Sequence, residues 1–261
     1  MIKKVLSIIL YSAIPLGIFI LLGFAVESNK NMPCKNLIVE VNGDQSFVDS
    51  AYVAGRIISQ FGLEDEKKIG EISLRNIEDL VSKIYYAEDS RVYRTIDGDI
   101  KVTVKQREPI ARVINSHNES FYIDTEGKLM KTSDRYTARV VVVTGHISAR
   151  YSPNLDLYAA QKQDEISQSQ RVLMGLNELI IYIRNDSFWD AWIDQIYVTR
   201  TGDFELVPKN GSHVIEFGKA ENIDEKFNKL LLFYQNGLTH LGWNSYNRIN
   251  LKFKNQIVCS K

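Results

Sequence analysis

The pattern of apolar and polar positions opens with one long apolar run. Residues 5–26 contain no charged side chain. A helix of this length extends about 33 Å at about 1.5 Å per residue, which is enough to cross a hydrocarbon core of about 30 Å. A cleaved signal peptide has a shorter apolar region and a small-residue cleavage site, which Gly23-Phe24-Ala25 matches poorly. We therefore expect residues 5–26 to form an uncleaved transmembrane anchor.

The charges on either side of this run predict its orientation. Lys3 and Lys4 precede it, and Glu27 follows it. By the positive-inside rule, residues 1–4 form a cytoplasmic tail and the rest of the chain lies across the membrane. Residues 27–36 are polar and contain Pro33, which is typical of a linker.

Apolar periodicity in the next region predicts two helices between strands. Helices place apolar residues three and four positions apart, whereas strands alternate with a period of two. The predicted strands are residues 37–43, 90–96 and 99–106, and the predicted helices are residues 47–61 and 74–84. Asp97-Gly98 joins the last two strands, and this dipeptide favours a type I′ hairpin turn. The predicted order is therefore β-α-α-β-β.

Pro109 interrupts the alternation of the last of these strands. Proline has no N–H to donate to a neighbouring strand, and it pushes Glu108 toward an extended conformation. An apolar pattern then resumes at Ile110. We interpret this break as the boundary between a domain of residues 37–108 and a domain of residues 109–261.

The second domain is predicted to be α+β, with a mostly antiparallel sheet and two packed helices. The predicted elements are a hairpin at 121–132, a buried strand at 138–147, a helix at 166–183, a meander of strands at 192–199, 203–208 and 213–218, and a helix at 223–240. At the end of the chain, Ile249, Leu251 and Phe253 alternate with polar residues and are expected to face one way. We expect a terminal strand or pair of strands there, at an edge of the sheet.

Composition argues against several functional classes. Lys plus Arg and Asp plus Glu both number 32 without a basic block, so the sequence lacks the charge pattern of nucleic-acid-binding proteins. The two cysteines, Cys34 and Cys259, are too few for a disulfide framework and lack metal-ligand spacing. Nucleophile, phosphate-loop and dinucleotide motifs are missing, so we expect no enzyme activity and no cofactor. The histidines fall in turns or beside glycine and are expected on the surface: His117, His146, His213 and His240.

One enzyme alternative stays open. Asp97-Gly98-Asp99 follows a single N-terminal anchor, and this combination resembles the anchored glycosyltransferases, in which an Asp-x-Asp motif binds the metal of a nucleotide sugar. The other interpretation is that Asp97-Gly98 only forms the hairpin turn. We favour the turn, because the glycine stands where a turn requires it and no Rossmann-like strand-helix alternation surrounds it.

Four motifs, in this order along the chain, resemble those of the FtsQ/DivIB family of bacterial cell division proteins. They are Val41-Asn42-Gly43, Gln106-Arg107-Glu108-Pro109-Ile110-Ala111, Tyr122-Ile123-Asp124-Thr125-Glu126-Gly127 and Ile249-Asn250-Leu251-Lys252-Phe253. With the anchor, they extend the resemblance over nearly the whole chain. Gln106 departs from the usual Glu, and Asn250 and Lys252 depart from the usual Asp and Arg.

The resemblance implies a POTRA domain at residues 37–108 and an FtsQ-type β domain at residues 109–261. It implies a non-catalytic protein of the bacterial inner membrane at the division septum, with its bulk in the periplasm. The implied partners are the single-pass division proteins FtsB and FtsL. The implied role is to link early assembly of the division ring to septal peptidoglycan synthesis, without nucleic acid or a small-molecule substrate. The alternative is a membrane-anchored POTRA protein that binds polypeptides during transport.

The resemblance and the pattern together indicate the partner-facing residues. An exposed terminal strand can accept a strand of a partner. The expected partner-facing set is Arg248, Asn250, Lys252, Phe253 and Ile257. The alternative is that Leu251, Phe253 and Ile257 are core residues of the last strand. A second docking surface is predicted at Tyr85, Tyr86, Arg91 and Tyr93, although an aromatic pair across strands would stabilise a sheet equally well.

Overall fold

The computed structural model of the protein describes residues 17–21, 23, 27, 32–43, 45–62, 68–153, 155–160 and 166–261. Most of the predicted anchor, residues 5–16, 22 and 24–26, lies outside the described residues, as do residues 1–4 and part of the predicted linker. Among the described residues, no helix has both the length and the apolar character needed to cross a membrane. The chain divides into two compact units, Met1–Gln106 and Arg107–Lys261, which we call unit 1 and unit 2.

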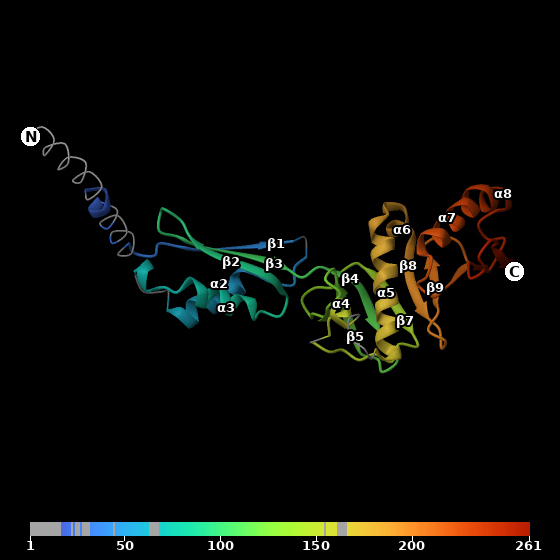
Figure 1. The fold of residues 1–261 in the computed structure, drawn as a ribbon, viewed down its shortest axis with the longest axis horizontal. Coiled ribbons are helices and arrows are strands. Elements are labelled where there is room, and N and C mark those ends of the chain that lie inside the picture. Colours follow the sequence, from blue (N-terminus) through green and yellow to red (C-terminus); the bar gives the residue numbers. More distant parts are fainter. Residues whose placement is uncertain are drawn as a thin grey trace, which may run out of the picture. The chain divides into compact units, whose positions relative to one another are not determined.

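Unit 1 is a three-stranded sheet with two helices on one face (Figure 1). Its elements are β1 (Leu37–Asn42), α2 (Ser50–Phe61), the 3₁₀ turn η1 (Ile69–Glu71), α3 (Leu74–Ser82), β2 (Ala87–Arg94) and β3 (Ile100–Gln106). β3 lies in the middle, parallel to β1 and antiparallel to β2. The predicted β-α-α-β-β order is confirmed.

Local signals define the ends of both helices of unit 1. The Asp49 side chain accepts a hydrogen bond from Ala51 N at the start of α2, and the Ser73 side chain accepts one from Asn76 N at the start of α3. α2 ends at Gly62, whose φ of 59° is readily reached only by glycine. The helices pack on alternate strand residues to form one core: Val53, Ile57, Ile77, Leu80, Val81, Ile100, Val102 and Val104. The other face of the sheet turns away from both helices.

The turn between β2 and β3 differs from the predicted type I′ turn. Gly98 has a φ of 95°, but Asp97 does not have the positive φ that a type I′ turn requires at both central residues. Gly98 N donates to Thr95 O at 3.3 Å, and Thr95 N donates to Asp99 O at 2.9 Å. The Thr95 hydroxyl also accepts a hydrogen bond from Asp99 N. These bonds close a longer loop in which glycine alone takes the left-handed conformation.

Unit 2 is built on a sheet whose described strands follow the order β12-β11-β10-β9-β8-β7-β4-β5-β6. The strands are β4 (Pro109–Ile114), β5 (Ser120–Asp124), β6 (Leu129–Lys131), β7 (Val141–Gly145), β8 (Ile193–Val198), β9 (Phe204–Pro208), β10 (Val214–Gly218), β11 (Arg248–Asn250) and β12 (Val258–Ser260). The helical elements are α4 (Leu157–Ala160), α5 (Gln168–Asn185), α6 (Ser187–Trp192), α7 (Ile223–Phe233), the π-helical turn η2 (Tyr234–Leu238) and α8 (Thr239–Leu241).

The sheet of unit 2 is mixed, and five of the eight neighbouring pairs among its described strands are antiparallel, which agrees with the predicted mostly antiparallel sheet. Three neighbouring pairs are parallel, namely β4 with β7, β7 with β8, and β10 with β11. Parallel neighbours require a long crossover connection. α4, α5 and α6 lie between β7 and β8, and α7, η2 and α8 lie between β10 and β11. The two predicted helices are present as α5 and α7, but the crossovers contain further helical elements that the periodicity did not indicate.

The helices of the two crossovers share one core. α5 begins with a capping box, in which the Ser167 hydroxyl and the Gln170 side chain each accept a backbone hydrogen bond of the other residue. Phe227 of α7 is fully buried, stacks on Tyr182 of α5 with ring centroids 4.9 Å apart, and lies 4.7 Å from the ring of Trp189 in α6. Aromatic contacts therefore join α7 of one crossover connection to α5 and α6 of the other.

Two of the sequence motifs meet at the start of unit 2. Arg107 Nε lies 3.5 Å from Asp124 Oδ2, and both side chains are largely buried. Asp124 Oδ1 also accepts hydrogen bonds from Glu126 N and Lys128 N, which closes the turn between β5 and β6. Burial raises the pKa of Asp124, although these bonds and Arg107 oppose the rise. The motif at Pro109 and the motif at Tyr122 are thus parts of one structural contact.

Candidate functional site

The described sheet of unit 2 ends at β12. β12 pairs only with β11 on one side, in antiparallel register, with Ile249 opposite Cys259 and Asn250 opposite Val258. β11 lies between β12 and β10 and is therefore an inner strand. The predicted terminal element is thus a pair of short strands, and the open edge belongs to Val258–Ser260 rather than to the strand that carries Arg248 and Asn250.

Three of the five predicted partner-facing residues converge on Glu216 of β10. Arg248 donates from its guanidinium to the carboxylates of Glu216 and Glu205. Asn250 Nδ2 donates to Glu216 Oε2 at 2.6 Å, and Lys252 Nζ lies 3.6 Å from the same oxygen. The hydrogen bond from Arg248 is the main cause that lowers the pKa of Glu216. This cluster, which we call the Glu216 cluster, ties β11 to β10 and β9.

Strand register places the Glu216 cluster in a row on the face of the sheet opposite the core. Glu216 is opposite Glu205 on one side and Asn250 on the other. The row continues to Tyr197, opposite Glu205, and to Val258, opposite Asn250. Tyr197 and Val258 are both exposed. The outer face thus has a charged centre and an exposed apolar residue at the open edge.

Phe253 does not lie on the buried face with Ile249 and Leu251, contrary to the predicted alternation. Ile249 and Leu251 are buried, but β11 ends at Asn250 and Phe253 is 47% exposed. The strand stops because Asn250 Oδ1 accepts a hydrogen bond from Lys252 N, which turns the chain. Lys229 Nζ of α7 then donates to Phe253 O at 2.6 Å and to Leu251 O at 3.3 Å.

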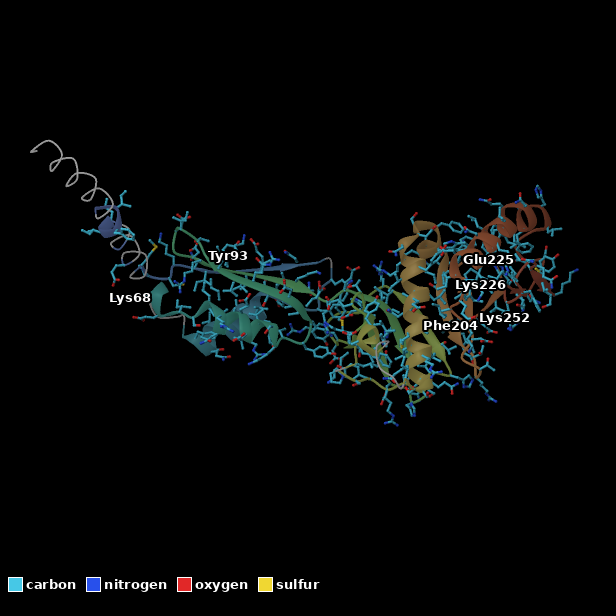
Figure 2. All side chains as sticks on the ribbon, viewed as in Figure 1. Lys68, Tyr93, Phe204, Glu225, Lys226 and Lys252 are labelled. Carbon is cyan, nitrogen blue, oxygen red and sulfur yellow. The ribbon has the colours of Figure 1, made fainter. Side chains whose placement is uncertain are left out.

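The remaining predicted residue, Ile257, is half-buried and packs against the core. The structure therefore divides the predicted set into three kinds. Arg248, Asn250 and Lys252 bind Glu216, Phe253 projects from the turn, and Ile257 faces inward. Figure 2 labels Lys252, whose side chain lies against Glu216 and Gly218 of β10. Glu216, Glu205 and Lys229 were not predicted, since each is distant in sequence from its partners.

The predicted second docking surface in unit 1 is not one continuous set. Tyr85 and Tyr86 follow α3 and contact each other edge to face, and Tyr86 stacks on Phe47 with ring centroids 5.3 Å apart. Arg91 and Tyr93 lie on β2, on the face of the sheet that turns away from the helices, because they alternate with core-facing Val92. Figure 2 labels Tyr93. The aromatic pair thus contributes to packing, whereas Arg91 and Tyr93 are exposed on the open face.

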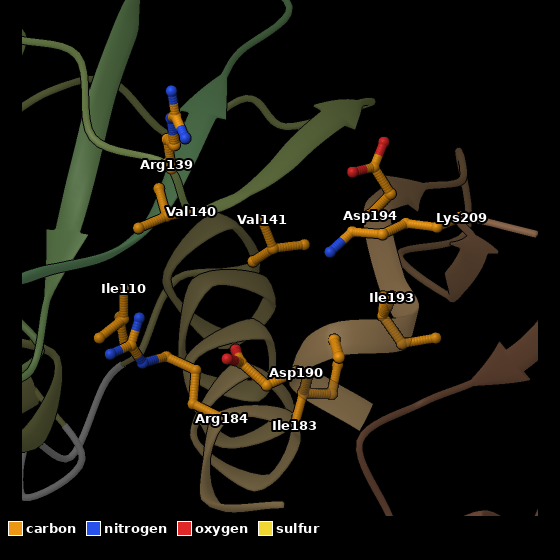
Figure 3. Close-up of a pocket in the computed structure, with 11 residues that line it drawn as sticks. Ile110, Arg139, Val140, Val141, Ile183, Arg184, Asp190, Ile193, Asp194 and Lys209 are labelled. Carbon is orange, nitrogen blue, oxygen red and sulfur yellow. The ribbon is translucent and has the colours of Figure 1, made fainter. Parts of the chain in front are cut away.

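A polar groove of about 420 Å³ opens in unit 2 where β4, β7 and β8 begin (Figure 3). Arg139, Arg184 and Lys209 line it together with Asp190 and Asp194, around an apolar floor that includes Val141 and Ile193. Arg184 also donates to Glu108 at 2.8 Å. The lining contains no histidine, cysteine or serine and none of the predicted partner-facing residues. The groove therefore has a lining of mixed charge, three basic and two acidic side chains, and lacks a nucleophile with an adjacent general base.

One of the four histidines is buried, which corrects the prediction that all of them lie on the surface. His213 is 1% exposed, and its Nε2 lies 2.9 Å from the hydroxyl of Tyr234 in η2. Burial lowers the pKa of His213 and raises that of Tyr234. Tyr234 also contacts the rings of Trp192 and Trp243. The π-helical turn is thus packed around a buried polar pair directly beside β10.

The Asp97-Gly98-Asp99 motif occupies the β2–β3 turn. Asp99 Oδ1 accepts a hydrogen bond from Asn36 Nδ2 at 2.9 Å. Among the residues that the structure describes, no group of three or more His, Cys, Asp or Glu side chains is placed to hold a metal ion. Cys34 and Cys259 are both free thiols, and burial raises the pKa of each.

These observations define an α+β protein whose candidate site is the open edge of the described sheet in unit 2. Residues 108–260 match the family described as FtsQ/DivIB, C-terminal related. Because this match covers more than half of the chain, the chain belongs to that family, which confirms the predicted family; the motifs at Tyr122 and Ile249 lie fully within the matched residues. The family consists of non-catalytic proteins of the division septum, and this chain is accordingly a cell division protein. No curated protein matches the sequence.

Proposed function

We propose that the protein is a membrane-anchored, non-enzymatic scaffold of the division machinery. In this proposal residues 5–26 span the inner membrane, the N-terminus is cytoplasmic, and residues 37–108 form a POTRA domain in the periplasm. The β domain, residues 109–261, binds single-pass partners of the FtsB and FtsL type by strand addition. Binding links early assembly of the division ring to septal peptidoglycan synthesis. The family membership supports the division role, and the proposal adds the partners, the topology and the mode of binding.

The observation that carries this proposal is the open edge of β12, which has exposed Val258 on the strand itself and exposed Phe253 in the segment between β11 and β12. β12 has one sheet neighbour among the described strands, and Val258 and Phe253 are 43% and 47% exposed. A partner strand can pair with the unpaired edge, because backbone groups supply affinity and alternate side chains supply specificity. Val258 and Phe253 provide the apolar contacts for those side chains.

The Glu216 cluster has a supporting role in this proposal. Arg248, Asn250 and Lys252 are engaged with Glu216, so they hold β11 and thereby β12 in the sheet. A short strand needs such support, because an added hydrogen bond contributes only about 0.5–1.5 kcal/mol. Anchoring of both partners in one membrane raises their effective concentration, and weak strand pairing then suffices for assembly.

Co-purification from the native membrane tests the proposal. We would compare the full-length chain with Phe253→Lys and Val258→Lys, which place charge beside the open edge. The matched control is Tyr158→Lys in α4, because Tyr158 is exposed to a similar degree, at 41%. α4 lies at the other end of the sheet, where Lys128, just before β6, forms an isolated backbone β-bridge with Asp156. Near-ultraviolet circular dichroism verifies folding of each variant.

We expect small single-pass coiled-coil proteins to co-purify with the native chain and with Tyr158→Lys, and to be lost from the two edge variants. Equal recovery with all four folded proteins would place the interface elsewhere. Absence of such partners from every sample, including the native chain, would contradict the scaffold function itself.

A further inference from the structure

The open face of the unit 1 sheet carries exposed apolar residues at one end. Ile38 of β1 and Tyr93 of β2 both lie opposite Lys101 of β3, so the three side chains form a row across the sheet. Ile38 is 39% exposed and Tyr93 is 45% exposed. Ile96, at the tip of the adjoining β2–β3 turn, is 92% exposed. We call Ile38, Tyr93 and Ile96 the tip patch.

The tip patch lies beside the segment that follows the predicted anchor. Lys35 N donates to Gly98 O at 3.0 Å, and Ile100 N donates to Asn36 O at 2.9 Å. A Cβ added at Gly98 would lie 2.9 Å from Met32 Sδ, so Met32 packs directly on the turn. The turn that presents Ile96 is therefore fixed to residues 32–36.

Chain length limits how far this turn can lie from the end of residues 5–26. Six Cα–Cα steps separate Val26 from Met32, and a fully extended chain covers at most about 3.5 Å per residue. The turn is therefore within about 20 Å of the last residue of the predicted anchor. One headgroup layer is about 5–8 Å thick, because the whole bilayer is about 10–15 Å thicker than its hydrocarbon core. The bound of about 20 Å therefore includes positions of the turn against the headgroups.

We propose that the tip patch rests in the headgroup region of the membrane beside the anchor. This inference rests on the anchored topology of the proposed function. Burying an apolar side chain at the membrane–water interface lowers the free energy. Tyrosine is enriched at this interface because its ring is apolar and its hydroxyl is polar. Lys101 lies between Ile38 and Tyr93, and its aliphatic part adds apolar surface to the row while Glu40 holds its ammonium group.

The charges around the tip patch indicate that apolar contact, rather than anionic lipid, drives this docking. Lys101 Nζ pairs with Glu40 at 2.7 Å. Exposed Lys35 and Lys68 near the turn are balanced by Asp97 and Asp99 of the turn itself. Without an excess of basic residues, attraction to anionic headgroups is weak. Docking is therefore expected on neutral phosphatidylcholine bilayers as well, and it would fix the orientation of unit 1 relative to the membrane.

Quenching by brominated lipid tests this inference on the full-length chain in phosphatidylcholine nanodiscs. A tryptophan is introduced as Ile96→Trp, with Tyr93→Trp as a second, more conservative probe. The matched control is Asn42→Trp, because Asn42 is exposed on the same face but at the far end of β1, about 13 Å from Ile38 at about 3.3 Å per residue. Emission of the parent chain, whose three tryptophans all lie in unit 2, is subtracted.

We expect the added emission of Ile96→Trp and Tyr93→Trp to shift to shorter wavelength and to lose most of its intensity in brominated discs, with that of Asn42→Trp unchanged. A chain that elutes with the discs but shows no quenching at residues 93 and 96 would overturn the inference and leave the proposed function standing, with a protein partner as the occupant of the patch. Equal quenching at residue 42 would also overturn it. A chain that does not elute with the discs would overturn the anchor, and the inference with it.

Discussion

Each unit presents a row of side chains on the sheet face turned away from its helices, but the two rows are built differently. In unit 2, Glu205, Glu216 and Asn250 occupy successive strands, and Arg248 binds both carboxylates. In unit 1, the row has Lys101 in the middle and exposed apolar residues, Ile38 and Tyr93, at both ends. The charged side chains of the unit 2 row bind one another across the strands. The apolar side chains of the unit 1 row are exposed.

This difference follows from the lengths of the strands. β11 and β12 have three residues each, so they form few backbone hydrogen bonds and need side-chain contacts to stay in the sheet. β3 has seven residues and is paired along its length on both sides, so the open face of unit 1 needs no such contacts. Side chains on the open face of this well-paired sheet, such as Ile38 of β1 and Tyr93 of β2, are therefore available for contacts with other surfaces.

The prediction with the largest expected effect tests whether the cores beneath the two rows unfold independently. Phe227→Ala removes a fully buried ring that contacts Tyr182 and Trp189, and it should destabilise unit 2 by about 3–5 kcal/mol. Urea unfolding followed by tryptophan fluorescence reports on unit 2 alone, because all three tryptophans lie there. The control is Ile77→Ala in the core of unit 1. If Ile77→Ala shifts the tryptophan transition as much as Phe227→Ala does, the two cores unfold together and the comparison fails.

The next effect concerns the centre of the unit 2 row. Glu216→Ala leaves Arg248, Asn250 and Lys252 without their shared carboxylate, and we expect a loss of about 1–2 kcal/mol. The loss stays below that of a fully buried pair because Arg248 is 44% exposed and water replaces part of the contact. Hydrogen exchange should show faster exchange in β11 and β12 with β8 and β9 unchanged. Unchanged exchange in β11 would mean that the cluster does not hold the terminal strands.

Regular elements could be predicted from the sequence because their signals are local. Val53 and Ile57 lie four residues apart and Gly62 follows them, so α2 was predicted to within a few residues. The meander of β8, β9 and β10 was likewise predicted, since alternation and glycine turns are short-range patterns. The predicted helix at 223–240 is continuous, but it contains the π-helical turn η2 at Tyr234–Leu238, which the 3.6-residue period does not indicate.

The site could be predicted only in part, because its contacts join distant residues. The alternation of Ile249 and Leu251 correctly predicted buried positions, but its extension to Phe253 was wrong. Nothing near Phe253 in sequence shows that Lys229 holds the backbone of this turn. Similarly, His213 lies beside a turn in sequence but is buried against Tyr234, which is 21 residues away. Pairings of this kind are set by the packing of α7 and η2, not by local pattern.

A smaller effect is expected from pH. Burial lowers the pKa of His213 in the folded state, so the unfolded state binds a proton first as pH falls below about 6.5. The contribution of neutral His213 to the free energy of unfolding of unit 2 is therefore fully present above that pH. It decreases below that pH, by at most about 1.4 kcal/mol per pH unit for one proton. Urea unfolding at pH 7.5 and pH 5.5, followed by tryptophan fluorescence, measures the loss. In His213→Gln the slope over this window should flatten, and an equal slope would show that other groups cause the pH dependence.

The smallest effect sharpens the comparison from the side of unit 1. Glu40→Gln removes the carboxylate that pairs with Lys101, but the side chains of both residues are partly exposed, at 48% and 28%. Exposed pairs of this kind contribute little because water replaces the lost contact. We therefore expect hydrogen exchange in β1 and β3 to match that of the native chain. Glu216→Ala removes a carboxylate of the unit 2 row, and Glu40→Gln removes the carboxylate that pairs with Lys101 of the unit 1 row. Faster exchange of β1 in Glu40→Gln, comparable to that of β11 in Glu216→Ala, would show that unit 1 also depends on side-chain contacts across its open face. In that case strand length would not explain why charged side chains pair across the unit 2 sheet while apolar side chains stay exposed on the unit 1 sheet.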